Sequence, residues 1–196
     1  MSYGSPQKSG FVVWITGLSG AGKTTLAQAL SEQMKAGGVP VVVLDGDQLR
    51  EILRADTFSG DHHTRSNRLR LALIYARLCQ ELANQGVNVI IATISMFREV
   101  QSWNRANIEN YFEIYLRVPY EELRRRDPKG IYRRFDAGEI SNVAGLDFSV
   151  DEPGAPNFLV DFDQKLNVHQ VANAAVQLLC DRFDWLQIKS SVRNED

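Results

Sequence analysis

The chain has 196 residues, 44% of them apolar, and a formal net charge of −2 at pH 7. This length and composition suit one globular domain with a single core, and the nearly balanced charge gives no basic footprint for nucleic acid. No segment approaches the roughly 20 apolar residues that span a membrane. We therefore expect a cytoplasmic protein without nucleic-acid or membrane partners, in which one domain, 11–186, lies between flexible tails at 1–10 and 187–196.

The first predicted element is the apolar strand FVVWIT, at 11–16, and the glycine-rich stretch GLSGAGKTT follows it directly. Gly17, four further residues and then Gly22-Lys23-Thr24 have the spacing of a phosphate-binding loop, whose backbone N–H groups surround an anion. A helix that begins near Lys23 adds the positive end of its dipole. The pattern predicts that ATP binds here, with Lys23 at the β- and γ-phosphates and Thr24 on Mg²⁺. The predicted ATP-binding residues of this loop are Gly17, Ser19, Gly20, Ala21, Gly22, Lys23, Thr24 and Thr25.

A second apolar run, VVVL at 41–44, is followed by two acidic residues, Asp45 and Asp47. One carboxylate can organise the waters around Mg²⁺, and the other can accept a proton from an attacking hydroxyl. We expect Asp45 to contact Mg²⁺ through water, while either acid can be the base. Asp-Gly is common in solvated turns, but two acids beside a phosphate loop favour catalytic roles for Lys23, Asp45 and Asp47.

A third apolar run, VNVIIATI at 87–94, follows a helical pattern that ends at Gly86, and a fourth, YFEIYLRV, covers 111–118. Continuous apolar strands that alternate with helices predict a parallel sheet with helices on both faces. We therefore expect an α/β protein with three layers, the fold of P-loop nucleoside triphosphate hydrolases and kinases. Ligands bind at the carboxyl ends of such strands, which brings together residues 17–25, 45–47 and 93–98.

The stretch RRRDPKG, at 124–130, ends a predicted helix and opens a polar segment rich in glycine, aspartate and arginine. Such a charge run is usually a solvated helix face. Its Asp-Pro-Lys-Gly ending instead favours a cationic lid over the transferring phosphate, and we expect this lid at about 124–150, with Arg126 at the ATP. An apolar stripe from Val168 to Phe183 predicts a last helix that closes the fold.

Four stretches together resemble adenylylsulfate kinase: WITGLSGAGKTTLA, LDGDQLR, ATISMFR, and RDPKGIYRRFDAGEISNVAGLD with EPGAP. The likeness covers most of residues 12–156. This family transfers the γ-phosphoryl group of ATP to the ribose 3′-hydroxyl of adenosine 5′-phosphosulfate (APS). The resemblance implies ATP and a nucleotide-activated anion as substrates, Mg²⁺ as cofactor, a homodimer, and acceptor contacts from Arg50, Phe58, Arg68, Ile94, Ser95, Arg98 and Lys129.

The loop that carries part of the acceptor site departs from the family pattern. The family has Asp-Arg and then an asparagine soon after its phenylalanine-serine pair, whereas FSGDHHTRSNRLRL is longer. Counting back from Gly86 without gaps places Arg68 on the family's arginine and Leu71 on its asparagine. A register that starts from Phe58 favours Arg65 instead.

A second departure lies further along, where Val143 replaces a phenylalanine that the family stacks on the acceptor. Because the phosphate loop, the two aspartates and the lid are intact, we expect the reaction to be retained while the acceptor is open. APS is the default, and another activated nucleotide, such as cytidine diphosphoramidate in capsule assembly, is the alternative. A further alternative is a non-catalytic nucleotide-sensing regulator, which would need the phosphate loop but neither the acidic pair nor the lid.

Overall fold

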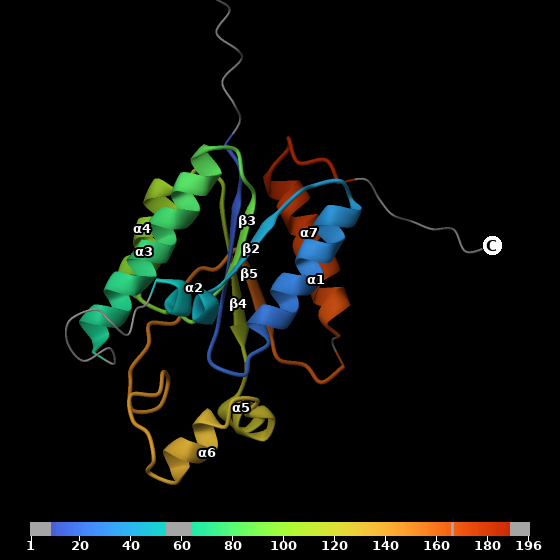
Figure 1. Ribbon diagram of the computed structural model, residues 1–196. Coiled ribbons are helices and arrows are strands. Elements are labelled where there is room, and N and C mark those ends of the chain that lie inside the picture. The colour runs from blue at the N-terminus through green and yellow to red at the C-terminus, as the bar shows by residue number, and fades with distance from the viewer. Residues whose placement is uncertain (1–8, 54–63, 166, 189–196) are drawn as a thin grey trace, which may run out of the picture.

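A computed structural model describes residues 9–53, 64–165 and 167–188. Within them, five parallel strands form one sheet in the order β2-β3-β1-β4-β5 (Figure 1). The strands are β1 (Val12–Thr16), β2 (Val42–Asp45), β3 (Val89–Ala92), β4 (Tyr111–Arg117) and β5 (Phe158–Asp161). The central strand β1 is buried along its whole length, as expected for apolar side chains covered on both faces.

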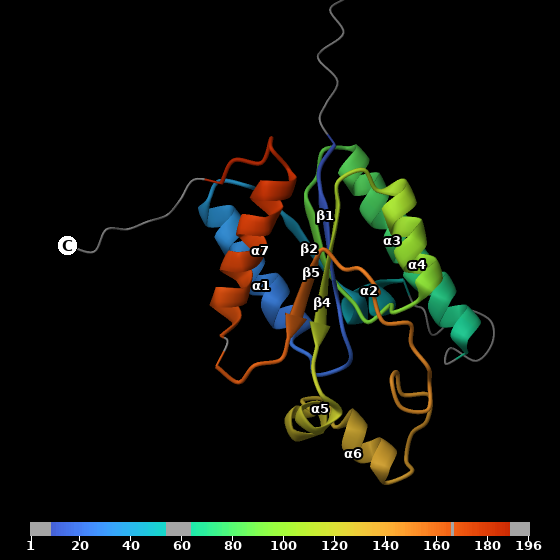
Figure 2. The same ribbon diagram turned by 180° about the vertical axis from the view of Figure 1, so that it is seen from behind.

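Helices cover the two faces of this sheet (Figures 1 and 2). On one face lie α1 and α7, which pack against each other, and on the other lie α3 and α4. The helices of the described residues are α1 (Lys23–Ala36), α2 (Gly46–Ile52), α3 (Arg65–Asn84), α4 (Arg98–Asn107), α5 (Tyr120–Arg126), α6 (Ile131–Asp136) and α7 (Val168–Arg182). The expected three-layer α/β fold is therefore confirmed.

The side chains of β1 divide the core into two parts because successive residues of a strand point to opposite faces. Val13 and Ile15 belong to the cluster that contains the inner faces of α1 and α7. Val12 and Trp14 belong to the cluster that contains those of α3 and α4. The strand that precedes the glycine-rich loop is thus held from both sides, which fixes the position of the loop.

The four strands expected from the sequence are present, with ends that differ by one or two residues. The helix expected to stop at Gly86 is α3, which ends at Asn84, and Gly86 takes the left-handed conformation (φ 80°) that ends many helices. The fifth strand, β5, has no counterpart among the expected elements. Its four residues are alternately exposed and half-buried at the sheet edge, so its apolar pattern is weak.

The carboxyl ends of the strands lie at one edge of the sheet, and the short helices α5 and α6 lie beyond that edge (Figure 1). The short helix α2 begins directly at the end of β2 and lies at the same edge. This edge is where the sequence places the phosphate loop and the acidic pair. Among the helices of the described residues, none combines the length and apolar character needed to cross a membrane.

Candidate active site

The glycine-rich loop leaves β1 in a conformation that only glycine adopts easily. Gly17 has φ 149°, and a Cβ atom there would lie 2.7 Å from the carbonyl oxygen of Leu116 on β4. Gly20 and Gly22 also have positive φ, and α1 starts immediately after Gly22. The backbone therefore curls at the amino end of α1, the geometry that presents N–H groups and the helix dipole to an anion.

The Lys23 side chain lies along this loop and donates a hydrogen bond to the Leu18 carbonyl at 2.9 Å. Burial lowers the pKa of the Lys23 ammonium to about 8, although the neighbouring carboxylate of Asp47 acts in the opposite direction. A partly desolvated cation interacts strongly with an anion that enters the loop. Lys23 thus provides concentrated positive charge at the phosphate site.

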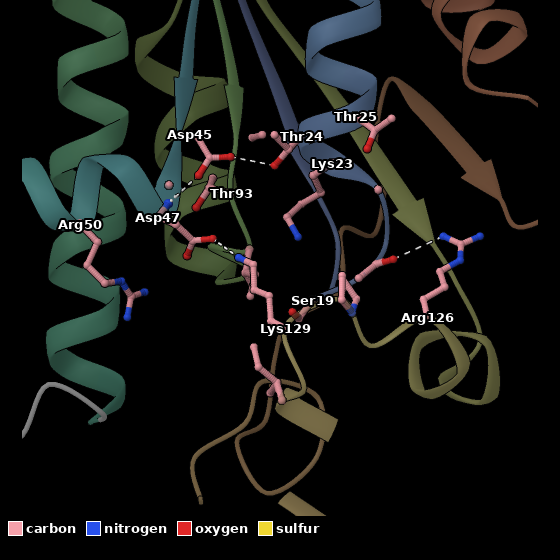
Figure 3. Close-up of a pocket in the computed structure, with 17 residues that line it drawn as sticks. Ser19, Lys23, Thr24, Thr25, Asp45, Asp47, Arg50, Thr93, Arg126 and Lys129 are labelled. Carbon is pink, nitrogen blue, oxygen red and sulfur yellow. Dashed lines mark hydrogen bonds and ion pairs between the residues drawn. The ribbon is translucent and has the colours of Figure 1, made fainter. Parts of the chain in front are cut away.

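The acidic residues at the junction of β2 and α2, Asp45 and Asp47, form a turn that contacts the phosphate loop. The Asp45 carboxylate accepts a hydrogen bond from the Asp47 backbone N–H at 2.9 Å, which caps α2. Its other oxygen accepts from the Thr24 hydroxyl at 2.7 Å, as Figure 3 shows. This contact distinguishes Asp45-Gly46-Asp47 from an isolated solvated turn.

The donor set at this point fits Mg²⁺. The Thr24 hydroxyl and the Asp45 carboxylate offer oxygen ligands, the type that Mg²⁺ prefers, beside a loop for phosphates that would complete its coordination. The described residues contain no group of three or more His, Cys, Asp or Glu side chains placed to hold a metal ion. This arrangement suits an ion held by one or two side chains and by a bound nucleotide, rather than by a cage made of protein alone.

Lys129, between α5 and α6, reaches the acidic turn from the lid and forms an ion pair with Asp47 (Figure 3). Burial raises the pKa of the Asp47 carboxyl, but the hydrogen bond and charge of Lys129, together with Arg50 and Lys23, outweigh it, so the pKa lies below its ordinary value. Asp47 therefore holds a negative charge among three cations.

The lid also contacts the phosphate loop directly. The Tyr132 hydroxyl on α6 donates to the Ser19 carbonyl at 2.9 Å, and Arg126 at the end of α5 donates to the Gly20 carbonyl at 3.3 Å. Arg126 also forms an ion pair with Glu122 at 2.6 Å. The cationic stretch is thus no free solvated helix face but lies against the loop where phosphates are expected.

These segments surround a main cavity of about 420 Å³ (Figure 3). Its lining combines the phosphate loop and the acidic turn with Arg50, Thr93, Ile94, Arg126 and Lys129. It therefore brings together all three predicted catalytic residues, Lys23, Asp45 and Asp47. The three stretches that the sequence places at the carboxyl edge of the sheet do meet there.

A second cavity of about 260 Å³ adjoins the phosphate loop at Gly22 and Thr25. Here the Arg126 guanidinium lies over the Phe162 ring, 4.9 Å from its centroid, and Val168 of α7 contributes to the lining. A planar cation and an aromatic ring beside a phosphate loop form a suitable environment for a nucleotide base. Phe162 was missed by the sequence analysis, because it follows the unexpected strand β5.

A third, small cavity of about 50 Å³ lies between α2, α3 and the segment after β3. Of the predicted acceptor residues, Arg50, Arg68, Ile94 and Ser95 line it, and Lys129 lines the main cavity instead. Arg98, at the start of α4, is not among the described residues that line any of these three cavities. Phe58 lies outside the described residues.

The structure distinguishes Arg65 from Arg68, the two arginines that the alternative sequence registers place in the acceptor site. Arg65 forms ion pairs with Glu99 at 2.9 Å and with Asp151 at 3.3 Å and is not among the described residues that line the small cavity. Arg68 lines this cavity and donates to the Asn142 carbonyl at 2.6 Å. The geometry therefore favours the gap-free register.

The short loop 142–148 closes the small cavity on the lid side. The Asp147 carboxylate accepts from the backbone N–H groups of Asn142 and Val143 at 2.7 and 2.6 Å. Val143 is buried and not among the described residues that line the cavity, whereas Phe148 lines it and lies under the Arg68 guanidinium at 4.5 Å. Sequence analysis missed Phe148, and its aromatic character in this altered stretch is the one signal that could have pointed to it.

The glycine-rich loop, the acidic turn and the cationic lid on a parallel sheet define a P-loop kinase. The family model of adenylylsulphate kinase matches residues 9–161, and the chain belongs to this family. It is accordingly a phosphotransferase that uses an alcohol group as acceptor.

Relatives carry two different acceptors in their names. The chain is 43% identical over 145 residues to a cytidine diphosphoramidate kinase of Campylobacter jejuni, covering 74% of this chain and 82% of that protein. It is 39% identical over 155 residues to a probable adenylyl-sulfate kinase of Archaeoglobus fulgidus, covering 79% and 97%. The structure of the APS kinase of Mycobacterium tuberculosis in complex with AMPPNP and APS has a TM-score of 0.79 and 30% identity, and covers 87% of this chain and 98% of that one.

Proposed function

We propose that this enzyme transfers the γ-phosphoryl group of ATP to the ribose 3′-hydroxyl of a nucleotide-activated anion, with APS as the default acceptor. The observation that carries the proposal is the main cavity, in which the phosphate loop, the acidic turn and Lys129 meet. The solved relative that binds an ATP analogue together with APS supports this assignment. A regulator without turnover would need neither the acidic turn nor the lid, and both lie at the phosphate loop.

In this proposal the phosphate loop, 17–25, binds the ATP phosphates, and Lys23 neutralises charge on the β- and γ-phosphates. The adenine base occupies the second cavity, which Arg126 and Phe162 line. Thr24 and, through water, Asp45 hold Mg²⁺, which neutralises charge on the phosphates when it is bound. The Thr24–Asp45 hydrogen bond aligns both side chains for this role in advance.

Asp47 lies on the acceptor side of the main cavity, next to Arg50 and Lys129. Its carboxylate can orient the acceptor hydroxyl and receive its proton. Its lowered pKa makes it a weak base, but a loose phosphoryl-transfer transition state depends more on positioning and charge neutralisation than on base strength. Lys129 and Arg50 supply that neutralisation on the acceptor side.

A second acceptor, cytidine diphosphoramidate, is favoured by the composition of the small cavity. Leu71 lines it where the family has an asparagine, so the side-chain hydrogen bond of an amide is replaced by an apolar contact. Phe148 provides an aromatic face from a different position. The 43% identical relative bears this activity in its name.

The test is a direct assay of the purified protein with Mg²⁺-ATP and each acceptor, with the phosphorylated product identified by mass spectrometry. Transfer to APS at ordinary kinase efficiency supports the default, and a higher kcat/KM with cytidine diphosphoramidate supports the alternative. ATP hydrolysis without transfer to either acceptor would overturn the proposal. We further propose a cytoplasmic homodimer, as the family resemblance implies, and light scattering after gel filtration tests the dimer.

A further inference from the structure

A buried tyrosine of α3, Tyr75, contacts the backbone of the acidic turn. The Tyr75 side chain is 2% exposed, and its hydroxyl donates to the Gly46 carbonyl at 3.0 Å. Arg50 lies near enough to the same hydroxyl for its charge to act against the effect of burial on the pKa of Tyr75. Burial raises the pKa of Tyr75 to about 12, so the hydroxyl keeps its proton and remains a donor. The hydroxyl thus contacts the backbone of the acidic turn next to an arginine of the acceptor side.

A contact with the Gly46 backbone can hold the acidic turn in place without touching either carboxylate. It lies between Asp45 and Asp47 and is the first residue of α2. A Cβ atom at Gly46 would lie 2.8 Å from the Thr93 hydroxyl oxygen. Gly46 therefore packs closely against Thr93 as well as the Tyr75 hydroxyl, and we call these two contacts the clamp. Thr93 is itself hydrogen-bonded to Ser95 at 2.8 Å.

The clamp matters because Asp45 is only half-buried and Asp47 is exposed. The Asp47 side chain is 67% exposed, and its partner Lys129 comes from the lid. Exposed ion pairs restrain side chains only weakly. A buried hydrogen bond to the backbone is a firmer restraint, since breaking it leaves a polar group unsatisfied in the core. The position of Asp47 relative to the phosphate loop therefore depends on Gly46, while Asp45 is also held by its hydrogen bond with Thr24.

We infer that the Tyr75 hydroxyl is a positioning group for phosphoryl transfer, which fixes the Gly46 backbone so that the acidic turn faces the phosphate loop. This inference rests on the proposed function. Tyr75 acts through Gly46 on the two neighbouring carboxylates. If its hydroxyl instead only contacted the acceptor in the small cavity, its loss would alter acceptor KM and leave kcat intact.

The test compares Tyr75→Phe with Tyr111→Phe. Phenylalanine keeps the ring of Tyr75 and removes only the hydroxyl. Tyr111 is an equally buried tyrosine at the start of β4, whose hydroxyl contacts Asn104 and Glu113 away from the cavities. For Tyr75→Phe we expect kcat to fall about tenfold with little change in ATP Kd or acceptor KM. For Tyr111→Phe we expect a lower Tm and unchanged kcat.

Unchanged kcat, a change in acceptor KM alone, or an equal loss of kcat in Tyr111→Phe would each overturn the inference. Gly46→Ala, which forces the turn away from Thr93, provides a second variant and should show the same loss of kcat. Hydrogen exchange of residues 45–52 gives a readout that needs no acceptor. Compared with the wild type, it should be faster in Tyr75→Phe and unchanged in Tyr111→Phe. If the wild type transfers the phosphoryl group to neither acceptor, the proposed function fails. Separately, unchanged hydrogen exchange of residues 45–52 in Tyr75→Phe would overturn the clamp.

Discussion

The Thr24 hydroxyl donates to the Asp45 carboxylate at 2.7 Å and so connects the start of α1 with the end of β2. The strand that leads into α1, β1, is separated from β2 by β3 in the sheet. Asp45→Asn keeps an oxygen that can cap α2 but removes the charge beside Thr24. We expect kcat to fall about 10²-fold, with a much smaller change in ATP Kd and a higher Mg²⁺ requirement.

Steady-state kinetics and a Mg²⁺ titration check this expectation. Asp181→Asn on α7, which removes an exposed carboxylate hydrogen-bonded to Gln177, serves as the control. An unchanged turnover number in Asp45→Asn would transfer the role to Asp47.

Lys23→Ala should abolish transfer with every acceptor, because the γ-phosphoryl group loses its nearest fixed cation. Electrostatic groups of this kind are commonly worth about 10²–10³ in rate. Lys35→Ala, in the last turn of the same helix, changes the net charge equally and should leave kcat intact. Near-normal turnover of Lys23→Ala would contradict the phosphate-loop assignment.

Lys129→Ala tests the contact between the lid and the acidic turn. The ion pair with Asp47 is exposed, with side-chain exposures of 55% and 67%, so its loss should barely change Tm. Acceptor kcat/KM should nevertheless fall about tenfold, because Asp47 and the transferring phosphate both lose a cation. Arg134→Ala, which breaks an exposed pair with Glu139 on the same lid, should leave the kinetics unchanged. Equal effects of the two variants would argue against a specific role of Lys129.

Substitution of two phenylalanines should distinguish the acceptor site from the ATP site. Phe148 lines the small cavity, and Phe162 lies under Arg126 beside the phosphate loop. A base stacked on an aromatic ring gains about 1–3 kcal/mol in single-stranded nucleic-acid complexes, a ten- to hundredfold change in affinity. Phe148→Leu should raise acceptor KM, and Phe162→Leu should raise ATP KM. If each variant affected both substrates equally, the assignment of the two cavities would be wrong.

Leu71→Asn tests how the acceptor is chosen. Leu71 is 6% exposed and lines the small cavity, so an asparagine there adds a hydrogen-bonding group to an apolar wall. We expect kcat/KM for APS to rise relative to that for cytidine diphosphoramidate. The ratio of the two values, measured with the same enzyme preparation, corrects for any loss of folded protein. A constant ratio would show that Leu71 does not select the base.

The parts of the site that could be predicted are those encoded by short, continuous patterns. The phosphate loop and Asp45-Gly46-Asp47 each follow an apolar strand, and parallel strands present their carboxyl ends at one edge. Their meeting in one cavity follows from the fold class, whereas Lys129 reaches them from the segment between α5 and α6. The three-layer architecture could likewise be predicted, because apolar strands alternate with helical patterns along the sequence.

Phe162 and Phe148 could not be found in this way, since each reaches its cavity through contacts between distant segments. Phe162 follows β5, which is short and lies at the edge of the sheet, so no continuous apolar run marks it. Phe148 lies under Arg68, 80 residues earlier in the chain. The choice between Arg65 and Arg68 likewise depends on which arginine of α3 faces loop 142–148, and spacing leaves both open.

Loop 142–148 satisfies two of its own backbone N–H groups through Asp147 and bridges Ala144 to Phe148, so much of its shape is determined locally. Substitutions within it can therefore remodel the wall of the acceptor cavity while the phosphate loop and the acidic turn keep their contacts. If the small cavity holds the acceptor, as proposed, a change in this loop would change which nucleotide the enzyme accepts. Exchange of residues 142–148 between enzymes with different acceptors would be the corresponding experiment in protein engineering.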